Sequence, residues 1–503
     1  MTKKVADLLR SELGILIVVA AARFFLHLAT NGQYGFHRDE LQTLDDARHL
    51  DWGFVAYPPI TPLIGRLQLV LFGTSLRGFR VCSAIAVSLV MVLTGLMARE
   101  LGGGRREQIL AAVAAGISPV SLAQGAVFQY VAFDYLLGVT VTYFVIRLLH
   151  TDDPRWWLPI GVTLGLGMET RYTMGFLALG LAAAVLLTPA RRFLRSKWCW
   201  IGVGASILVF LPNLLWQAQH HFISLDFLSH LHARDLRQGR YSGFYSEQLW
   251  VCVNLATVPI TVLGLWFYFA REEGRRYRVL GWTFALTFAL FAVAGARSYY
   301  TAPLYPMLIA AGSVLFAILS DATGWSRLGW SIQWTGILAG GVGFALLLLP
   351  VAPVGSHLWA ITSKMHDQFR EEIGWPDLAR SVAKVYDSLA PQERKDAGIL
   401  TGNYGEGGAL NLYGPALGLP HAMSLTNSFW YRGYDPRQPQ TVIVVGFDLD
   451  EARKLFASCD VAAKNTNRFG VENEESRDHP DILLCRNLSM PWDVYWEHYR
   501  RFG

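Results

Sequence analysis

Two neighbouring carboxylates, Asp39 and Glu40, stand in the charged segment "YGFHRDELQTLDDARHL", residues 34–50. The segment follows the apolar stretch "LGILIVVAAARFFLHLA", so both carboxylates lie at the end of a long apolar run. A carboxylate that is partly desolvated in such a place can act as a general base on a hydroxyl or an amine. The alternative is that the two acids belong to an ordinary charged loop at a membrane surface. This alternative stays open because an acidic pair by itself has little specificity.

Two arginines in similar positions could bind phosphate. Arg171 lies in "GMETRYTMG" and Arg297 in "GARSYYTAPLYP", where Tyr299 and Tyr300 could add hydroxyl donors. Guanidinium groups bind phosphate through charge-assisted, bidentate hydrogen bonds. The alternative is a pair of snorkelling arginines beside an aromatic belt. A carboxylate base together with arginines at bilayer depth suits a phosphate-linked lipid donor and a polar acceptor.

Other polar side chains lie at the ends of apolar segments. Asp134 occurs in "FQYVAFDYLL", and His220 and His221 begin a group of four histidines within residues 220–232. Their spacing fits no standard zinc pattern, which favours a polar or amphipathic loop, although a divalent metal is left open. We predict His37, Tyr57, His220 and His221 as substrate contacts.

The elements that must position these residues are membrane helices. Of the 503 residues, 52% are hydrophobic and only 17% are charged, whereas soluble proteins carry about a quarter charged residues. Eleven apolar segments predict spans at 12–30, 76–98, 107–124, 132–149, 156–169, 172–189, 198–216, 247–270, 279–295, 301–319 and 330–351. The shorter segment 60–73 predicts a helix that lies at the membrane interface.

The charges of the connecting loops predict the orientation. Alternate loops are short and basic, for example Arg191, Arg192, Arg195 and Lys197, and the positive-inside rule places them in the cytoplasm. The net charge of +5 is explained by these loops, and no basic run with interleaved aromatics indicates nucleic-acid binding. The opposite loops carry the acids, arginines and histidines named above. Because charges at membrane depth are costly, these residues are expected to line one functional cavity.

The composition changes near residue 353. Strand-like and helical segments then alternate, which predicts a transmembrane domain over 1–352 and a small α/β domain over 353–503 on the outer, periplasmic side. Cys459 and Cys485 both fall in strand-like segments of this domain. Paired cysteines in an oxidising compartment tend to bond, so a disulfide is predicted. Two separately buried thiols are the alternative.

Three segments resemble a known family. These are "HRDELQTLDDARHLDWGFVAYPPITPLIGRL", "LPNLLWQAQHHFISLDFL" and "RSYYTAPLYPMLIAAG". They resemble the C-type glycosyltransferases, in the family 39 and protein-mannosyltransferase-like branch that includes aminoarabinose and galacturonic acid transferases of lipid A. The resemblance implies a bundle of eleven to thirteen helices with interfacial helices in the first external loop. It also implies a sugar donor linked to polyprenyl phosphate.

The resemblance also implies residue roles. Asp39 matches the aspartate that activates the acceptor, Glu40 its acidic neighbour, and Asp134 an acid of the second external loop. Arg171 and Arg297 match basic positions near the lipid phosphate. One departure is that Ala56-Tyr57 precedes the paired prolines, where aminoarabinose transferases have a Glu-Lys pair.

The sequence therefore predicts a glycosyltransferase of the bacterial inner membrane with a periplasmic active site. It would move a sugar from polyprenyl phosphate to a lipid, glycan or protein acceptor, with Asp39 as the base. A lipid or glycan transporter is one alternative, although no internal repeat typical of many transporters is present. A non-catalytic membrane receptor or assembly factor is another.

Overall fold

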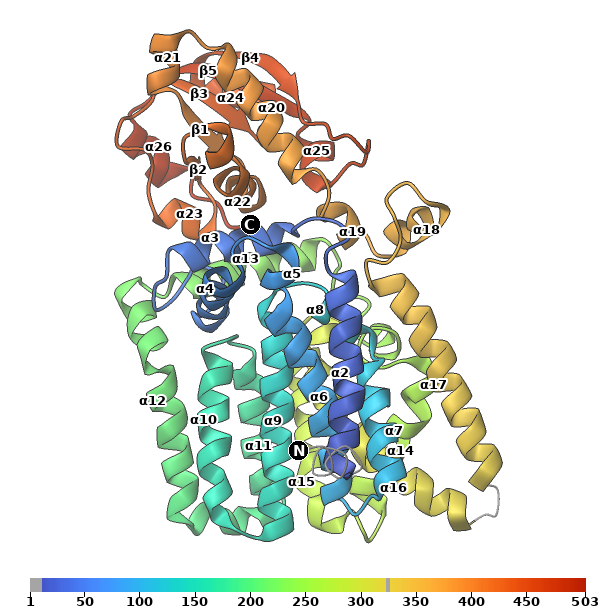
Figure 1. Ribbon diagram of the computed structural model, residues 1–503. Coiled ribbons are helices and arrows are strands. Elements are labelled where there is room, and N and C mark those ends of the chain that lie inside the picture. Colours follow the sequence, from blue (N-terminus) through green and yellow to red (C-terminus); the bar gives the residue numbers. More distant parts are fainter. Residues whose placement is uncertain (1–10, 323–325) are drawn as a thin grey trace.

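The structure is a computed structural model that describes residues 11–322 and 326–503, so residues 1–10 of the predicted first domain lie outside the described residues. Long apolar helices run side by side and form the body of the molecule. A small domain with a β-sheet covers one end of this body (Figure 1). The fold is mainly α.

Six helices of the described residues are long and apolar enough to cross a membrane. They are α2 (Glu12–Thr30), α6 (Val81–Glu100), α9 (Tyr130–Thr151), α12 (Lys197–Gln219), the joined η6 (Ser298–Leu304) and α16 (Tyr305–Ala322), and α17 (Ser326–Leu348). Two bent pairs raise the number to eight: α7 (Arg105–Gly116) with α8 (Pro119–Gly125), and α11 (Met174–Leu187) with η2 (Pro189–Arg195).

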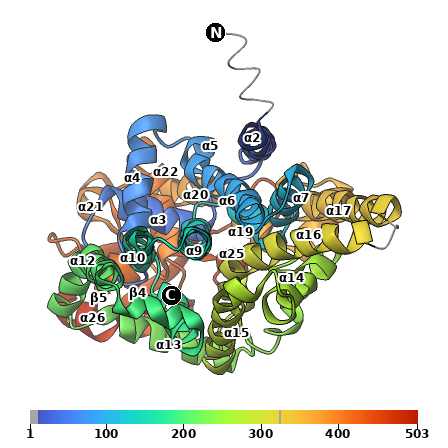
Figure 2. The ribbon, with the colours of Figure 1, turned by 90° about the horizontal axis from the view of Figure 1, so that it is seen from below.

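Three further predicted spans contain shorter helices, namely α10 (Trp157–Met168), α14 (Val258–Ala270) and α15 (Arg278–Val293). The span predicted at 247–270 is α-helical only from Val258 onward. All eleven apolar segments are therefore largely helical, whereas the number of eleven membrane crossings stays a prediction. Seen along the helices, α2 and α17 lie at the rim of the body (Figure 2).

Glycines allow close packing inside the helical body. A Cβ added to Gly161 of α10 would lie 1.9 Å from the carbonyl oxygen of Gly202 in α12. The same holds between α14 and α16, where a Cβ on Gly312 would lie 1.7 Å from the carbonyl oxygen of Ile260. Small residues at such crossings let helix backbones approach, which is how membrane helices gain packing energy.

Shorter helices lie across one end of the body, beneath the small domain (Figure 1). They are α3 (Arg38–Arg48), α4 (Ile60–Phe72), α5 (Leu76–Phe79) and α13 (Ile223–Arg237). Helix α4 fills the segment predicted to be interfacial, and it exposes Leu63, Leu67, Val70 and Leu71. An apolar face without a protein partner is typical of a helix that lies in the membrane interface.

The C-terminal domain contains a five-stranded sheet in the order β2-β1-β3-β5-β4. The strands are β1 (Gly398–Thr401), β2 (Ala422–Ser424), β3 (Thr441–Val445), β4 (Phe456–Lys464) and β5 (Asp481–Leu488). Strand β1 runs parallel to β2 and β3, and β5 pairs antiparallel with β3 and β4. Strands β1, β2 and β3 are wholly buried, which explains their continuous apolar sequences.

Helices surround this sheet and connect it to the helical body (Figure 1). They are α18 (His357–Met365), α19 (Gln368–Glu371), α20 (Trp375–Ser388), α21 (Pro391–Asp396), α22 (Tyr404–Tyr413), α23 (Asn427–Tyr431), α24 (Leu449–Leu455), α25 (Glu474–Asp478) and α26 (Trp492–His498).

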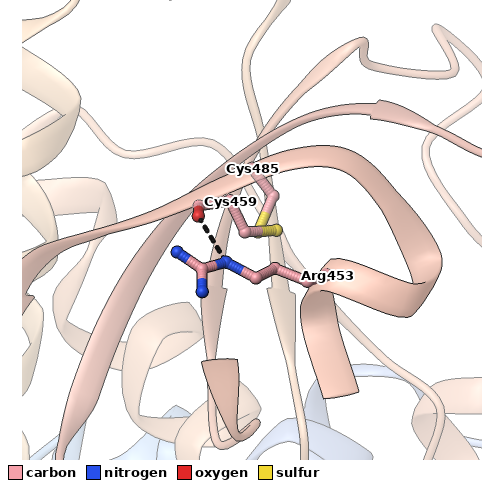
Figure 3. Close-up of a disulfide and its surroundings, with 3 residues drawn as sticks. All are labelled: Arg453, Cys459 and Cys485. Carbon is pink, nitrogen blue, oxygen red and sulfur yellow. Dashed lines mark hydrogen bonds between the residues drawn. A yellow bond between two sulfur atoms is a disulfide. The ribbon is translucent and has the colours of Figure 1, made fainter. Parts of the chain in front are cut away.

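The predicted disulfide between Cys459 and Cys485 is confirmed (Figure 3). The two cysteines face each other across the antiparallel pair of β4 and β5. Directly opposed residues of an antiparallel pair have their Cβ atoms about 4.5–5.5 Å apart, close to the separation that a disulfide needs. Arg453 of α24 donates a hydrogen bond to the carbonyl of Cys459, 3.4 Å away.

One apolar core joins the two predicted domains. Phe36, Leu41 and Leu44, on and before α3, belong to the same buried cluster as Trp375 of α20 and Leu410 of α22. Helix α3 is thus packed between the helical body and the sheet domain. Side chains in the first turn of α3, such as Asp39, are therefore positioned by both the helical body and the sheet domain.

Candidate active site

A cavity of about 320 Å³ lies where α3, α9, α13, η6 and α22 meet. Asp39 and Arg171 both line it, although 132 residues of sequence separate them. Its apolar wall includes Phe176, Leu228 and Leu231. The residues predicted at the ends of distant apolar segments therefore meet in one place.

Asp39 occupies the first turn of α3. The turn is closed by a capping box in which the backbone N–H of His37 donates to Glu40, and His37 accepts from the backbone N–H of Asp39. The carboxylate of Asp39 accepts hydrogen bonds from Gln129 Nε2 (2.8 Å) and from the Tyr404 hydroxyl (2.9 Å). Its side chain keeps 42% of its surface exposed, so it can reach a bound molecule.

The surroundings of Asp39 keep it ionised. Partial desolvation by itself would raise the pKa of Asp39. His37, Arg38 and the hydrogen bond from Tyr404 outweigh desolvation, so the net shift of this pKa is downward. Burial raises the pKa of Tyr404 well above its usual value, with the charge of Asp39 acting in the same direction. Tyr404 is therefore a neutral donor, and Asp39 is a carboxylate that is free to accept a proton from a substrate.

Arg171 lies in the turn between α10 and α11, inside a cage of tyrosines. Its guanidinium carbon is 3.9 Å from the ring centroid of Tyr300, 5.0 Å from that of Tyr130 and 5.4 Å from that of Tyr299. The side chain is only about 7% exposed. Asp134 lies 3.7 Å from Nη1, yet Nη1 has no hydrogen-bond acceptor within the described residues. A buried donor without a close acceptor is costly, so this guanidinium retains capacity to bind an anion.

The cavity wall as a whole is cationic. Five arginines line it, and Asp39 is the one acidic side chain among its described lining residues. These arginines are Arg38, Arg171, Arg234, Arg240 and Arg297. A concave surface with an excess of one charge concentrates ligands of the opposite charge. The expected ligand is therefore an anion.

Arg297 is already paired. Its Nε and Nη2 atoms donate to the two carboxylate oxygens of Asp235, at 2.7 and 2.9 Å. The same carboxylate lies 3.7 Å from Arg240 and 3.9 Å from Arg234. Of the two arginines that the sequence predicted as phosphate ligands, Arg171 is thus the one with an unsatisfied donor.

The structure gives Glu40 a structural position instead of the predicted catalytic one. Its carboxylate is fully buried and accepts two hydrogen bonds from Arg80, at 2.8 and 2.6 Å. It also accepts from the backbone N–H groups of Phe128 and His37. Glu40 does not line the cavity, and it ties α3 to the start of α6.

The other predicted residues divide between the cavity and its surroundings. Tyr299, Tyr300 and Tyr57 line the cavity, and the Tyr57 hydroxyl donates to Asp46 (2.6 Å). Asp134 supports Arg171 from a neighbouring small pocket.

The predicted histidines lie away from the cavity wall. His37 caps α3, and the ring of His220 stacks on Trp216 with 3.9 Å between ring centroids. His221 lies in the turn after α12. No group of three or more His, Cys, Asp or Glu side chains that could hold a metal ion occurs within residues 11–322 and 326–503.

Several cavity residues were not predicted from the sequence. They are Arg38, Gln129, Tyr130, Arg234 and Arg240. Arg38 adjoins Asp39 and could have been inferred from that position. Tyr404 lies in the glycine-rich segment "GNYGEGGA", where the sequence gives only a weak indication of a contact with the acceptor.

Comparison with known proteins identifies similar glycosyltransferases. Residues 56–216 match the family model of dolichyl-phosphate-mannose-protein mannosyltransferases. The chain is 25% identical over 213 residues to the lipid A galacturonosyltransferase RgtD of Rhizobium johnstonii, covering 41% of this chain and 44% of that protein. It is 28% identical over 289 residues to the undecaprenyl phosphate-α-4-amino-4-deoxy-L-arabinose arabinosyl transferase 1 of Pseudomonas fluorescens. This match covers 53% of this chain and 50% of that protein. The chain thus aligns with about half the length of these relatives.

Solved structures extend the similarity to nearly the whole fold. The crystal structure of ArnT from Cupriavidus metallidurans bound to undecaprenyl phosphate superposes with a TM-score of 0.54. The match covers 93% of this chain and 97% of that one at 15% identity. The resemblance to the C-type membrane glycosyltransferases is therefore confirmed. The helical membrane fold with a small α/β domain is shared with ArnT.

Proposed function

We propose that the protein is a membrane glycosyltransferase that moves a sugar from a polyprenyl-phosphate donor to an acceptor on the periplasmic side. One observation carries this proposal. The ionised carboxylate of Asp39 and the buried guanidinium of Arg171, whose Nη1 has no hydrogen-bond acceptor within the described residues, line the same partly apolar cavity. A base and a phosphate ligand are the two groups that such a transfer requires.

Asp39 and Arg171 act on opposite sides of the bond that breaks. An acceptor hydroxyl or amine attacks the anomeric carbon of the donor sugar, and Asp39 takes its proton. The bond between the anomeric carbon and the phosphate oxygen breaks, and polyprenyl phosphate leaves with the bonding electrons. Arg171 stabilises the charge on the leaving phosphate, and the tyrosine cage holds the guanidinium in place before the reaction.

The lipid part of the donor has an apolar route out of the cavity. A second pocket of about 130 Å³ shares Phe176, Leu228 and Leu231 with the cavity and continues to Phe291 of α15. Phe176 and Phe291 stack with their ring centroids 4.8 Å apart. An isoprenoid chain would lie along this wall, towards the lipid, while its phosphate meets Arg171. The undecaprenyl phosphate bound to ArnT supports this donor class.

The test of the function is a comparison of membrane lipids and glycans by mass spectrometry. A strain that lacks the protein should lose one sugar modification. The wild-type gene should restore it, and a gene encoding Asp39→Asn should not. An unchanged set of glycans together with altered transport of a lipid would favour the transporter alternative.

Tyr404 should act as a positioning residue, because it donates to the carboxylate that takes the proton. We expect Tyr404→Phe to lower kcat at least about tenfold, since a hydrogen bond to a charged group is worth about 1.5–3 kcal/mol. The present hydrogen bond lowers the pKa of Asp39, so the carboxylate is lost only as the pH falls through that lowered value. Removing the hydroxyl raises this pKa, and the acidic limb of the kcat–pH profile should move to higher pH.

Tyr386→Phe is the matched control, because the hydroxyl of Tyr386 donates to the Arg394 carbonyl in the same domain, away from the cavity. It should leave both the rate and the pH profile unchanged. If Tyr404→Phe kept the wild-type pH profile, the role of Tyr404 would be packing alone.

The disulfide provides a test of the location. In a protein whose other cysteines, Cys82, Cys199 and Cys252, are replaced by alanine, thiol reagents should modify Cys459 and Cys485 only after reduction. Reduction should also destabilise the domain by about 3 kcal/mol in the chain-entropy model. A membrane-impermeant reagent should reach both thiols in intact cells after reduction and denaturation. Labelling that requires cell lysis would place the domain, and Asp39 with it, in the cytoplasm.

A further inference from the structure

A third pocket, of about 200 Å³, lies beside the active-site cavity. The two share a thin wall. Residues 53–55 line the pocket and residues 56–58 line the cavity, while Ser428 faces the pocket and its neighbour Asn427 faces the cavity. The pocket is therefore a direct neighbour of the cavity, separated from it by residues 53–58 and 427–428.

An exposed aromatic ring forms one side of the pocket. Tyr431 at the end of α23 leaves 45% of its surface exposed. It is supported from behind by His220 and Trp216, with ring centroids 4.9 and 6.1 Å from its own. Trp216 is held between His220 and Gly53, where an added Cβ would lie 2.4 Å from the indole. The arrangement fixes an aromatic face toward the pocket.

Polar groups face the same space. Ser428 is about 5% exposed as a residue, and its hydroxyl is buried and has no hydrogen-bond partner within the described residues. Asp51 adds a carboxylate that also accepts from the indole N–H of Trp216 (2.8 Å). Arg432 adds a guanidinium whose position is fixed by ion pairs with Asp45 and Asp46. An unsatisfied buried hydroxyl requires a partner, and a ligand that carries hydroxyl groups supplies one.

We propose that this pocket is a saccharide-binding subsite. A sugar ring has one face of C–H groups, which packs on the electron-rich face of an aromatic ring, and a rim of hydroxyls that both donate and accept hydrogen bonds. Tyr431 matches the face, and Ser428, Asp51 and Arg432 match the rim. The volume is below the roughly 300–1,000 Å³ of pockets for drug-sized ligands, and it suits one ring.

The role of the subsite in catalysis rests on the proposed function. Under that function, the subsite holds the sugar next to the acceptor position, so the acceptor is a glycan or glycolipid of at least two sugar units. Sugar binding itself does not depend on transfer, and the two can be tested apart.

The binding test uses saturation-transfer NMR on the full chain in lipid nanodiscs, with methyl β-D-glucopyranoside and N-acetylglucosamine as millimolar probes. We expect saturation of ring protons with at least one of these probes. Tyr431→Ala should weaken binding about tenfold, which corresponds to about 1.4 kcal/mol, because the aromatic face is lost. Tyr431→Phe, which keeps the ring, should bind like wild type, and Ser428→Ala should bind more weakly.

Two controls locate the binding. Trp52→Ala removes an aromatic side chain next to Asp51 in sequence, about 64% exposed and not part of the pocket wall, and should not affect sugar binding. Arg171→Ala alters the active-site cavity and should also retain the sugar signal.

Absence of a sugar signal in wild type, or an unchanged signal in Tyr431→Ala, would overturn the proposal. If Tyr431→Ala and Trp52→Ala instead lower the amount of membrane-inserted protein equally, with no effect on sugar binding, the rings are membrane anchors and the proposal is overturned. Sugar binding without any transferase activity would refute the proposed function and leave the subsite intact.

Discussion

Replacing Asp39 with Asn should reduce sugar transfer about 10²–10⁴-fold, the usual contribution of a general base. Asn has nearly the same shape and can still accept a hydrogen bond from Tyr404, while a turn of the Gln129 amide would satisfy the new N–H₂ group. The protein should therefore fold and insert normally. The loss should appear in kcat, measured with purified protein and a polyprenyl-phosphate sugar.

Asp493→Asn is a suitable control for this change. Asp493 is an exposed acid at the second position of α26, as Asp39 is at the second position of α3, and it does not line the cavity. The control should retain full activity. Wild-type turnover by a well-folded Asp39→Asn protein would remove the base from the mechanism.

Removal of Arg171 should have the next largest effect. Arg171→Ala should lower kcat about 10²–10³-fold, the cost of losing one preorganised donor to a developing negative charge. Arg171→Lys should recover only part of the rate, because an ammonium group keeps the charge without the planar fork of donors. The apparent affinity for the donor should fall more than the affinity for the acceptor.

Arg297→Ala provides the comparison. It too should weaken donor use more than acceptor use, but by about tenfold or less, because Asp235 already neutralises its guanidinium. Both variants are compared by donor titration at a fixed acceptor concentration. If Arg297→Ala weakened donor use more than Arg171→Ala, Arg297 would be the main ligand of the donor phosphate and Arg171 the lesser one.

The location of the site could be predicted from sequence, because desolvated charge at a membrane is expensive and hence rare. An apolar run followed at once by Asp39 and Glu40 is conspicuous for that reason. The same rule identified Arg171 and Arg297. The disulfide between Cys459 and Cys485 was also predictable, since both cysteines fall in strand-like segments of one small domain.

The division of roles within the acidic pair was not predictable. Successive residues of a helix point about 100° apart, so Asp39 and Glu40 face different surroundings although they are neighbours in sequence. One faces the cavity, and the other is buried against Arg80. Sequence gives the period of the helix, but the direction of each face is decided by what packs against it.

The sequence alone determined that the chain is a membrane protein, which segments are apolar helices, and which charges lie at their ends. These properties follow from composition and local order. Only the tertiary structure decided that Tyr404, 365 residues after Asp39, donates to its carboxylate, and that Tyr130 and Tyr300 enclose Arg171. Contacts of this kind depend on how the sheet domain docks on α3, which is the sum of many packing interactions spread along the chain.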